Sequence, residues 1–504
     1  MSAANQERAG DVSFALTVAG LSPETFQVVD FMGEEALNRD FGYRLTLASR
    51  DSRLRPEELL GREATFTVES RREGPVLRVP THGIIGEVQV RHQAGPFTLF
   101  GAVLVPRLAR LHLSVFSEVY TLEKGIPGVL EEILKGAGFS TQDYQFRTGE
   151  SYRERSFLCQ YAESLHAFLD RWAEREGLVY AFDHEGNRER VLFFDQPHQK
   201  PSWNRSLVFR PPGDPDVGLA DDTLFEWSET VREIPARAVV QDFNYRKAAL
   251  EIREEKAVPG GADRTVEEVY GENLRTNAEA GRQARLLAER LEAGRRILEG
   301  KSTAVGIRAG TTVRVSRHGR EGMNGDFFVT RLRCEGSQPM ASLASMAGGG
   351  GGEAGGPARF QAAFEGIPAN VPFRPQQRTP WPRIPGVVQA IVEAEGSGKF
   401  AELNEYGEYK VRFPFALSKR KSQKGSGWVR LATPLAGSDN GMHFPLRKET
   451  EVLVAFLGGD PDQPVIVGAL HNSEGRNLIS NQNPEKNMIR SAGGHFILLN
   501  DANL

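Results

Sequence analysis

Short apolar runs separated by turn-forming residues dominate the chain from Val12 to about Ser117. The runs carry β-branched and aromatic residues, and Gly, Pro, Asp or Asn stand between them, which favours strands joined by turns. They are FALTV, FQVVDF, YRLTLAS, ATFTVES and FTLFGAVLV. This part of the chain is therefore predicted to be mostly β.

A helical pattern interrupts the strands twice before residue 340. The first predicted helix lies near 160–177, where four apolar residues recur at i, i+3, i+4 and i+7 and form one stripe. These residues are Leu165, Phe168, Leu169 and Trp172. Ser164 is placed to cap this helix and Gly177 to end it. A second helix is predicted near 277–299, with Leu287, Leu291 and Leu298 on its apolar side.

The pattern breaks between residues 341 and 385. SLASMAGGGGGEAGGP has the composition of a flexible linker, and its stretch 348–356 suggests no function of its own. IPANVPFRPQQRTPWPRIP follows, and its prolines favour an extended strap. We therefore expect a linker and a strap between two folded parts.

Short strands return from residue 386 to residue 472. VVQAIVEA, EYKVRFPF, GWVRLATP, EVLVAF and PVIVGAL suit a small Greek-key barrel of the OB type. The last two are joined by GGDPDQP, whose Gly, Asp and Pro are typical of a tight turn. We interpret Asp460 and Asp462 as turn formers, without acid–base or metal chemistry.

The tail, with MIRSAGGHFILLND, alternates like a strand and then the chain stops. An apolar strand with no partner is a liability in a monomer, because its edge can pair with other chains. The pattern favours pairing with another chain, or continuation in a longer native protein.

Composition excludes several classes of protein. The chain has 504 residues, a net charge of −4 and 39% hydrophobic residues, so it has no global electrostatic preference for nucleic acid. Its two cysteines, Cys159 and Cys334, cannot form a disulfide scaffold and fit a reducing compartment. The N-terminus lacks a secretory signal pattern, and no apolar run approaches the ~18 residues of a membrane helix.

Motifs for chemistry are weak throughout. A phosphate-loop candidate at Gly396–Lys399 has Glu393 in place of its first Gly and Phe400 in place of Ser or Thr. The histidines show no HxxxH or HExxH spacing, GxSxG is absent, and no pair of carboxylates sits in an apolar frame that would raise a pKa. Cys159 is interpreted as a buried small side chain. We therefore predict no catalytic residue, no metal site and no cofactor.

One basic cluster, Lys419–Lys424, remains open to two interpretations. In a loop of an OB-type barrel it could contact phosphates, as in oligonucleotide binders. It could instead be a solvated hairpin tip. This second interpretation is favoured, because no stacking aromatics are interleaved with the basic residues.

Four segments in order resemble the VgrG spike proteins of type VI secretion systems and, more distantly, the hub and spike proteins of contractile phage tails. CQYAESLHAFLDRWAEREGLVYAF is similar to a family signature, and its matching residues are Gln160, Tyr161, Glu163, Ser164, Phe168, Arg171, Glu174, Gly177, Tyr180 and Phe182. The strap resembles the family's RP-x-x-x-TP segment. Matches in the barrel and its closing hairpin include Trp428, Glu451, Val452, Gly459, Asp460, Pro461, Pro464 and Gly468.

This resemblance implies an α+β, mostly β chain. Residues 1–340 would form a hub module of two β-barrel-like subdomains with inserted helices, and 341–385 a linker and strap. Residues 386–472 would form an OB-fold barrel, and 473–504 the start of a trimeric β-helix needle. The signature residues would be structural.

The function implied is that of a homotrimeric spike at the tip of an inner tube, which punctures target envelopes and carries effectors without being an enzyme. Its implied partners are the hexameric inner-tube protein, a PAAR-type tip protein, baseplate proteins and effectors or their adaptors, with no nucleic acid and no stable membrane anchor. It would assemble in the bacterial cytoplasm and leave by sheath contraction, without a signal peptide.

Two other functions stay open. One is a spike carrying a lytic enzymatic domain, which would need ~150 further residues after the barrel. The other is an OB-type nucleic-acid or glycan-binding module, which rests on Lys419–Lys424.

Overall fold

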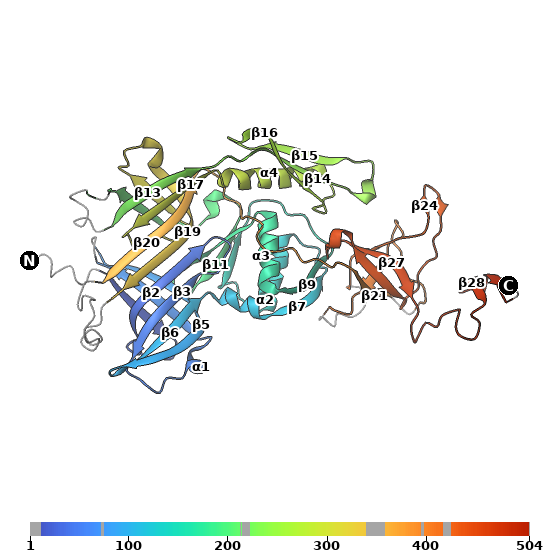
Figure 1. Cartoon of the computed structure of the whole chain (residues 1–504), viewed down its shortest axis with the longest axis horizontal. Helices are drawn as coiled ribbons and strands as arrows, with labels where there is room; N and C mark the ends of the chain where they lie inside the picture. Colours follow the sequence, from blue (N-terminus) through green and yellow to red (C-terminus); the bar gives the residue numbers. More distant parts are fainter. Residues whose placement is uncertain are drawn as a thin grey trace, which may run out of the picture. The chain divides into compact units, whose positions relative to one another are not determined.

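The computed structural model of the chain consists of two compact units, each built from separate stretches of sequence (Figure 1). It describes residues 12–71, 75–211, 213, 222–338, 358–394, 398–416 and 425–502. The first unit comprises Met1–Ser114, Ile126–Tyr152 and Leu165–Pro380; the second comprises Val115–Gly125, Arg153–Ser164 and Trp381–Leu504. Among the described residues, no helix has the length and apolar character needed to cross a lipid bilayer.

The first unit contains a half-barrel of six antiparallel strands in the order β1-β4-β5-β6-β3-β2. Their bounds are β1 Val12–Val18, β2 Gln27–Ala36, β3 Gly42–Ser49, β4 Glu63–Ser70, β5 Leu77–Ala94 and β6 Phe97–Val105. Alternate residues of β1 and β4 are buried, and Phe14, Phe31 and Phe66 pack together in the core, with the rings of Phe31 and Phe66 4.7 Å apart. The alternation seen in the sequence therefore produces one apolar face.

Six further strands of the first unit close into a barrel. The order is β19-β18-β12-β13-β17-β20, and β20 also pairs with β19, which completes the ring. The bounds are β12 Asn204–Phe209, β13 Thr223–Val231, β17 Arg296–Ser302, β18 Thr312–Ser316, β19 Gly325–Ser337 and β20 Arg359–Pro368. β19 also pairs with β2, so the barrel and the half-barrel share one continuous sheet.

Helix α3, Leu165–Glu176, begins later than the sequence predicted. Its apolar stripe is confirmed, since Phe168, Leu169 and Trp172 are fully buried. The preceding residues Leu158–Ser164 form strand β9 instead of the expected first helical turns. β9 pairs with β7, Val115–Tyr120, and these non-local hydrogen bonds override the local pattern.

Helix α4, Asn277–Ala293, covers the sheet β15-β14-β16 (Figure 1). The Thr276 side chain caps it by accepting a hydrogen bond from the Glu279 amide. The prediction that it continues to residue 299 is wrong, because Gly294 ends the helix and Leu298 lies fully buried in β17. The three strands are β14 Pro235–Asp242, β15 Ile252–Ala257 and β16 Ala262–Tyr270.

The second unit contains the predicted OB-type barrel. Its strands lie in the order β22-β21-β26-β27-β23, and the backbones of Tyr409 and Val429 exchange hydrogen bonds of 2.9 and 2.8 Å between the two edge strands. The bounds are β21 Val387–Glu393, β22 Lys410–Arg412, β23 Arg430–Leu431, β26 Glu451–Phe456 and β27 Pro464–Leu470. Val119 of β7 and Cys159 of β9 belong to the same apolar core.

The remaining elements are short. In the first unit they are α1 Pro56–Leu59, η3 Arg107–Leu113, α2 Ile126–Gly136, β8 Tyr144–Arg147, β10 Val179–Asp183, β11 Arg190–Phe194, η4 Pro197–Gln199, η5 Tyr245–Lys247 and η6 Glu321–Met323. In the second they are β24 Ala436–Gly437, β25 Asn440–Gly441, η7 Leu457–Gly459, β28 Lys486–Arg490 and β29 Phe496–Asn500. β10 and β11 pair as an antiparallel hairpin, and β8 adds to β11 in parallel.

The apolar strand near the end of the chain has a partner within the chain, contrary to expectation. β29 pairs antiparallel with β28, from Arg490↔Phe496 to Lys486↔Asn500. The Gly493-Gly494 turn makes this possible, with φ +95° at Gly494. The hairpin leaves every residue of β29 exposed, however, so local pairing does not bury its side chains.

Candidate functional site

The first signature residues lie in β9 and act as packing and hydrogen-bonding groups of the second unit. Gln160 is fully buried, accepts a hydrogen bond from the Tyr120 hydroxyl at 2.8 Å and donates one to the Glu163 carbonyl at 2.9 Å. The Tyr161 ring meets Phe415 edge to face, with centroids 5.5 Å apart. Ser164 ends the strand by pairing with Val115.

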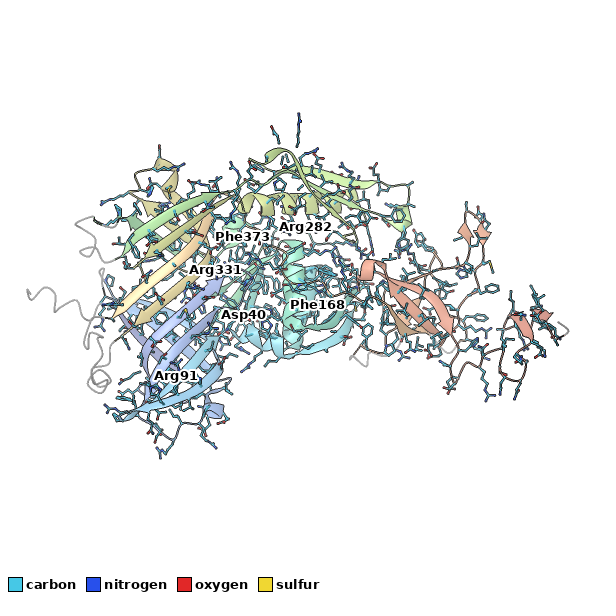
Figure 2. All side chains as sticks on the ribbon, in the orientation of Figure 1. Asp40, Arg91, Phe168, Arg282, Arg331 and Phe373 are labelled. Carbon is cyan, nitrogen blue, oxygen red and sulfur yellow. The ribbon has the colours of Figure 1, made fainter. Side chains whose placement is uncertain are left out.

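The signature residues of α3 form a buried aromatic and cationic stack. The Arg171 guanidinium lies 4.7 Å from the centroid of the Phe168 ring and 5.4 Å from that of Trp172. Phe168, labelled in Figure 2, is fully buried. A buried guanidinium on aromatic faces is a packing element that lysine cannot replace, because the planar group stacks.

Gly177 ends α3 at a position that only glycine fits. Its φ is +67°, and a Cβ there would lie 2.7 Å from Cδ2 of Leu286. Its carbonyl accepts a hydrogen bond of 3.0 Å from Nη1 of Arg374, which also donates to the Asp195 carbonyl at 2.8 Å. Nε of Arg374 donates to Glu289 at 2.6 Å. Arg374 opens the RP-x-x-x-TP segment, so the proline strap is fixed to the end of the signature helix.

The same strap is fixed a second time, by Glu174. Its carboxylate accepts hydrogen bonds from the amides of Arg378 and Thr379, both at 2.9 Å, and from the Thr379 hydroxyl at 3.0 Å. Burial raises the pKa of Glu174, and these hydrogen bonds oppose that rise. Two matched sequence pieces that lie far apart in the chain thus form one network, which spacing along the chain did not reveal.

Tyr180 lies in β10 and is fully buried. Its hydroxyl donates a hydrogen bond to Asp170 at 2.8 Å, and its carbonyl accepts one from the Asn38 amide at 3.0 Å. Burial first, and then the nearby carboxylates, raise the pKa of this phenol. Tyr180 therefore acts as a neutral donor that connects α3, β10 and the turn at Asn38.

The GGDPDQP connector between β26 and β27 does more than turn the chain. Asp460 accepts hydrogen bonds from the Trp381 indole and from the Asp462 amide, both at 3.0 Å, and Asp462 accepts one from the Cys159 amide at 2.6 Å. Gly459 has a φ of +76°, and its carbonyl accepts from the Ile384 amide at 2.8 Å. The two aspartates thus bind the strap and β9 to the barrel.

The other signature residues of the barrel are structural positions. Pro461 is buried, Pro464 opens β27, and Gly468 pairs with Leu453 beside a register shift. Val452 is fully buried in the core, while Glu451 accepts a hydrogen bond from Asn472 at 2.9 Å. The Lys410 ammonium lies 4.9 Å from the centroid of the Trp428 ring.

One buried carboxylate has a raised pKa that the sequence did not predict. Glu189 is buried, and burial raises its pKa to about 7, although the Arg107 amide donates a hydrogen bond to it at 2.6 Å. The tertiary fold buries this residue beside Arg107 and Asp143. A glycosidase needs a pair of carboxyl groups, one on each side of the bond that is cleaved, so Glu189 alone does not support that function.

Several sequence candidates fall outside the part of the chain that the structure describes. They are the basic cluster Lys419–Lys424, the Gly-rich stretch 348–356 and part of the phosphate-loop candidate. Cys159 and Cys334 are both buried, and for Cys159 this agrees with its interpretation as a packing residue.

Comparison with protein families and relatives agrees with this architecture. Residues 34–340 match the family model of the phage tail baseplate hub (GPD), and residues 403–471 match that of the type VI secretion system/phage-baseplate injector OB domain. The type VI secretion system spike protein VgrG1c of Pseudomonas aeruginosa is 28% identical over 464 residues, which cover 90% of this chain and 61% of the relative. VgrG3 of Vibrio cholerae is 27% identical over 480 residues, 92% of this chain and 45% of the relative.

The chain therefore spans about half to two thirds of the length of these relatives. Another relative is named the actin cross-linking toxin VgrG1 of Vibrio cholerae, at 29% identity over 92% of this chain and 42% of the toxin.

Solved structures show the same fold. The Escherichia coli c3393 protein, described as a type VI secretion component similar to the T4 tail proteins gp27 and gp5, superposes with a TM-score of 0.65 at 20% identity, over 90% of this chain and 99% of that one. VgrG in a Francisella PdpA–VgrG complex superposes with a TM-score of 0.62 at 10% identity, over 97% and 75% of the two chains. The chain has a half-barrel and a barrel followed by an OB domain, and the hub family model matches more than half of its length. It therefore belongs to the phage tail baseplate hub (GPD) family and is a homologue of the VgrG spike proteins of type VI secretion systems.

Proposed function

We propose that this chain forms a homotrimer and works as the hub and spike at the tip of a contractile injection machine. It transmits force from the contracting sheath and carries effectors, and no bond is made or broken by the residues described above. The β28–β29 hairpin carries this proposal.

The hairpin exposes apolar side chains on both of its faces. Phe496 and Leu498 point to one face of β29 and Ile497 and Leu499 to the other, since neighbouring residues of a strand alternate. Their exposed fractions are 63, 39, 62 and 62%. A two-stranded hairpin is marginal in water, and threefold closed symmetry would bury its faces and edges against two further copies.

The buried networks support a mechanical role. The buried side chains of Arg374, Glu174 and Asp462 fix the strap and β9 by hydrogen bonds. Such bonds, made by charged groups in a low dielectric, are strong and directional. A part that transmits force needs this rigidity more than it needs a solvent-exposed polar cleft.

The partners proposed follow from the family. They are the hexameric inner-tube protein at the hub, a PAAR-type protein at the tip, baseplate proteins, and effectors or adaptors. The Francisella relative was solved in a complex with PdpA, which gives one instance of a VgrG protein bound to another protein. We further propose assembly in the bacterial cytoplasm and release by contraction.

The test is the molar mass of the full chain by sedimentation equilibrium or light scattering. We expect a trimer, and we expect the double variant Ile497→Glu with Leu499→Glu to be monomeric with unchanged circular dichroism. Leu113→Glu, at an 84% exposed leucine of the first unit, is the matched control and should remain trimeric. If the chain alone is monomeric, a version extended with the C-terminal sequence of its own gene must form the trimer.

A monomer in both forms would contradict the proposal. If that monomer also bound single-stranded DNA with a steep salt dependence, the OB-type binding module would replace it. An enzymatic spike, the third possibility, would require a catalytic domain of the kind that the name of the actin cross-linking relative implies for that protein.

A further inference from the structure

Two histidines and one aspartate from separate segments of the first unit meet at one point. Asp40 lies in the turn between β2 and β3, His112 in η3, and His166 in the first turn of α3. Each offers one ligand atom, and these atoms all lie within 4.8 Å of one another. The histidines come from elements that are far apart in sequence, so no HxxxH or HExxH spacing reveals them.

Each imidazole of this His–His–Asp cluster approaches a different oxygen of the Asp40 carboxylate, at a distance compatible with ligands of one cation. Nε2 of His112 lies 3.2 Å from Oδ2 of Asp40, and Nε2 of His166 lies 3.2 Å from Oδ1. Bonds of about 2.0–2.1 Å in a tetrahedral zinc site place ligand atoms about 3.3 Å apart. The imidazole rings are stacked, with centroids 3.8 Å apart and planes inclined by 14°, so both Nε2 atoms face the same carboxylate.

The surroundings of His166 resemble those of a metal-bound histidine. Its Nδ1 lies 3.0 Å from Oδ2 of Asp170, and Oδ1 of Asp170 accepts a hydrogen bond of 2.8 Å from the Tyr180 hydroxyl. The negative charge of a carboxylate this close to the far nitrogen favours the proton at Nδ1, which leaves the Nε2 lone pair available to a metal. This arrangement therefore orients His166 toward Asp40 and His112.

Hydrogen bonds to backbone carbonyls hold the three segments in place. The Asn38 side chain donates to the Leu178 carbonyl at 3.0 Å, which fixes the turn before Asp40 against the β10 region. The Leu165 amide donates to the Ser114 carbonyl at 3.1 Å, which joins the start of α3 to the end of η3. The ligand atoms are thus positioned by the fold, as a metal site requires.

The His–His–Asp cluster is also accessible. All three residues line a cleft of about 810 Å³, and the His112 side chain is 53% exposed, whereas that of His166 is 3% exposed. A cation can reach the cluster from the side of His112.

We propose that Asp40, His112 and His166 form a binding site for a divalent transition-metal ion of the zinc class, with Asp170 as a positioning residue. Two imidazoles and one carboxylate suit such an ion better than Mg²⁺ or Ca²⁺, which prefer oxygen ligands. The bound ion joins the β2–β3 turn, η3 and α3 at one point.

Protonation of His166 is the alternative to metal binding at this cluster. Burial lowers the pKa of His166, but contacts with Asp170 and Asp40 outweigh burial and raise this pKa to about 10. A protonated His166 between two carboxylates would account for the two short distances to that ring without a metal. A neutral His112 that donates a hydrogen bond from Nε2 to Oδ2 of Asp40 at 3.2 Å would account for the second imidazole, so metal titration must distinguish the two states.

Titration calorimetry of the full chain, freed of metals with a chelator, distinguishes a metal site from a protonated His166 that binds no metal. We expect one Zn²⁺ to bind per chain, Mg²⁺ to bind far more weakly, and Zn²⁺ to raise the melting temperature. His112→Ala should weaken Zn²⁺ binding by at least about tenfold and keep the fold, because this side chain is half exposed. Asp170→Asn should weaken binding by about 10–100-fold with all three ligands retained.

His92→Ala is the matched control, because His92 is an exposed histidine of the same unit. It should bind Zn²⁺ like the unchanged chain. Co²⁺ in place of Zn²⁺ should give visible absorption bands that His112→Ala abolishes and His92→Ala retains. The proposal is overturned if the unchanged chain binds no Zn²⁺, if Mg²⁺ binds as tightly, or if His112→Ala binds Zn²⁺ as well as His92→Ala does.

Discussion

Two hairpins of the second unit, β26–β27 and β28–β29, have similar strand-forming sequences but opposite environments. In EVLVAF of β26, Val452, Val454 and Phe456 are buried and alternate with partly exposed residues. In FILLN of β29, all five residues are exposed. The first hairpin completes a closed barrel, while the second ends in solvent. Backbone pairing alone therefore does not decide stability, since the burial that follows pairing provides most of it.

The largest expected change in the free energy of unfolding comes from placing a charge on a buried residue of one hairpin and on an exposed residue of the other. Val454→Asp places a carboxylate in the barrel core and should destabilise the second unit by at least about 4 kcal/mol, or prevent folding. Ile497→Asp in β29 should change the free energy of unfolding by less than about 0.5 kcal/mol, measured by urea denaturation of the monomeric form. Equal losses for both variants would show that β29 is packed within a single chain.

The connectors of the two hairpins differ in the same way. Asp462→Ala removes the acceptor of the buried Cys159 amide and should cost about 1–3 kcal/mol. Ser491→Ala removes the side chain that accepts from the His495 amide at 3.1 Å in the exposed turn of β28–β29. Water replaces that acceptor, so its urea midpoint should be unchanged. An unaffected Asp462→Ala variant would show that the GGDPDQP connector only turns the chain.

The smallest expected effect concerns glycines with positive φ in the two connectors. Gly459→Ala should cost about 1–2 kcal/mol, because its φ is +76° and an added Cβ would lie 3.4 Å from Cδ of Arg383. Gly494, at φ +95°, has open space around its Cα. Gly494→Ala should loosen only the hairpin, detectable as faster amide exchange in β28 and β29 with the same melting temperature. A lower melting temperature would mean that the hairpin unfolds together with the barrel.

Much of the fold could be predicted from local patterns. The apolar stripe from Leu165 to Trp172 identified α3, and short apolar runs with their turn residues identified the strands of the OB barrel. These signals suffice where neighbouring residues decide the structure. They failed at Leu158–Ser164, where the alternation of Phe157, Cys159 and Tyr161 toward the barrel core marks a strand but stands directly before a helical stripe.

The contacts of the site residues were harder to predict from the sequence than the strands and helices. The resemblance identified Glu174, Gly177 and the RP-x-x-x-TP strap separately, but their contacts are non-local and emerged only in the fold. The His–His–Asp cluster has no sequence signal at all, because its first two residues are 72 positions apart. Tertiary burial likewise gives Glu189 its raised pKa. Chemistry assembled from distant segments is invisible to motif spacing.

The interleaving of the two units bears on how such chains can be recombined. The chain crosses from one unit to the other five times, after Ser114, Gly125, Tyr152, Ser164 and Pro380. Suppose that two related genes recombine within the sequence that encodes the strap. The barrel from one gene would then have to pack against β7 and β9 from the other, because these strands fill the same core. Functional hybrids are therefore expected only where these two short strands match the incoming barrel. The OB barrel is inherited as a module only together with a fragment encoded far upstream, before α3.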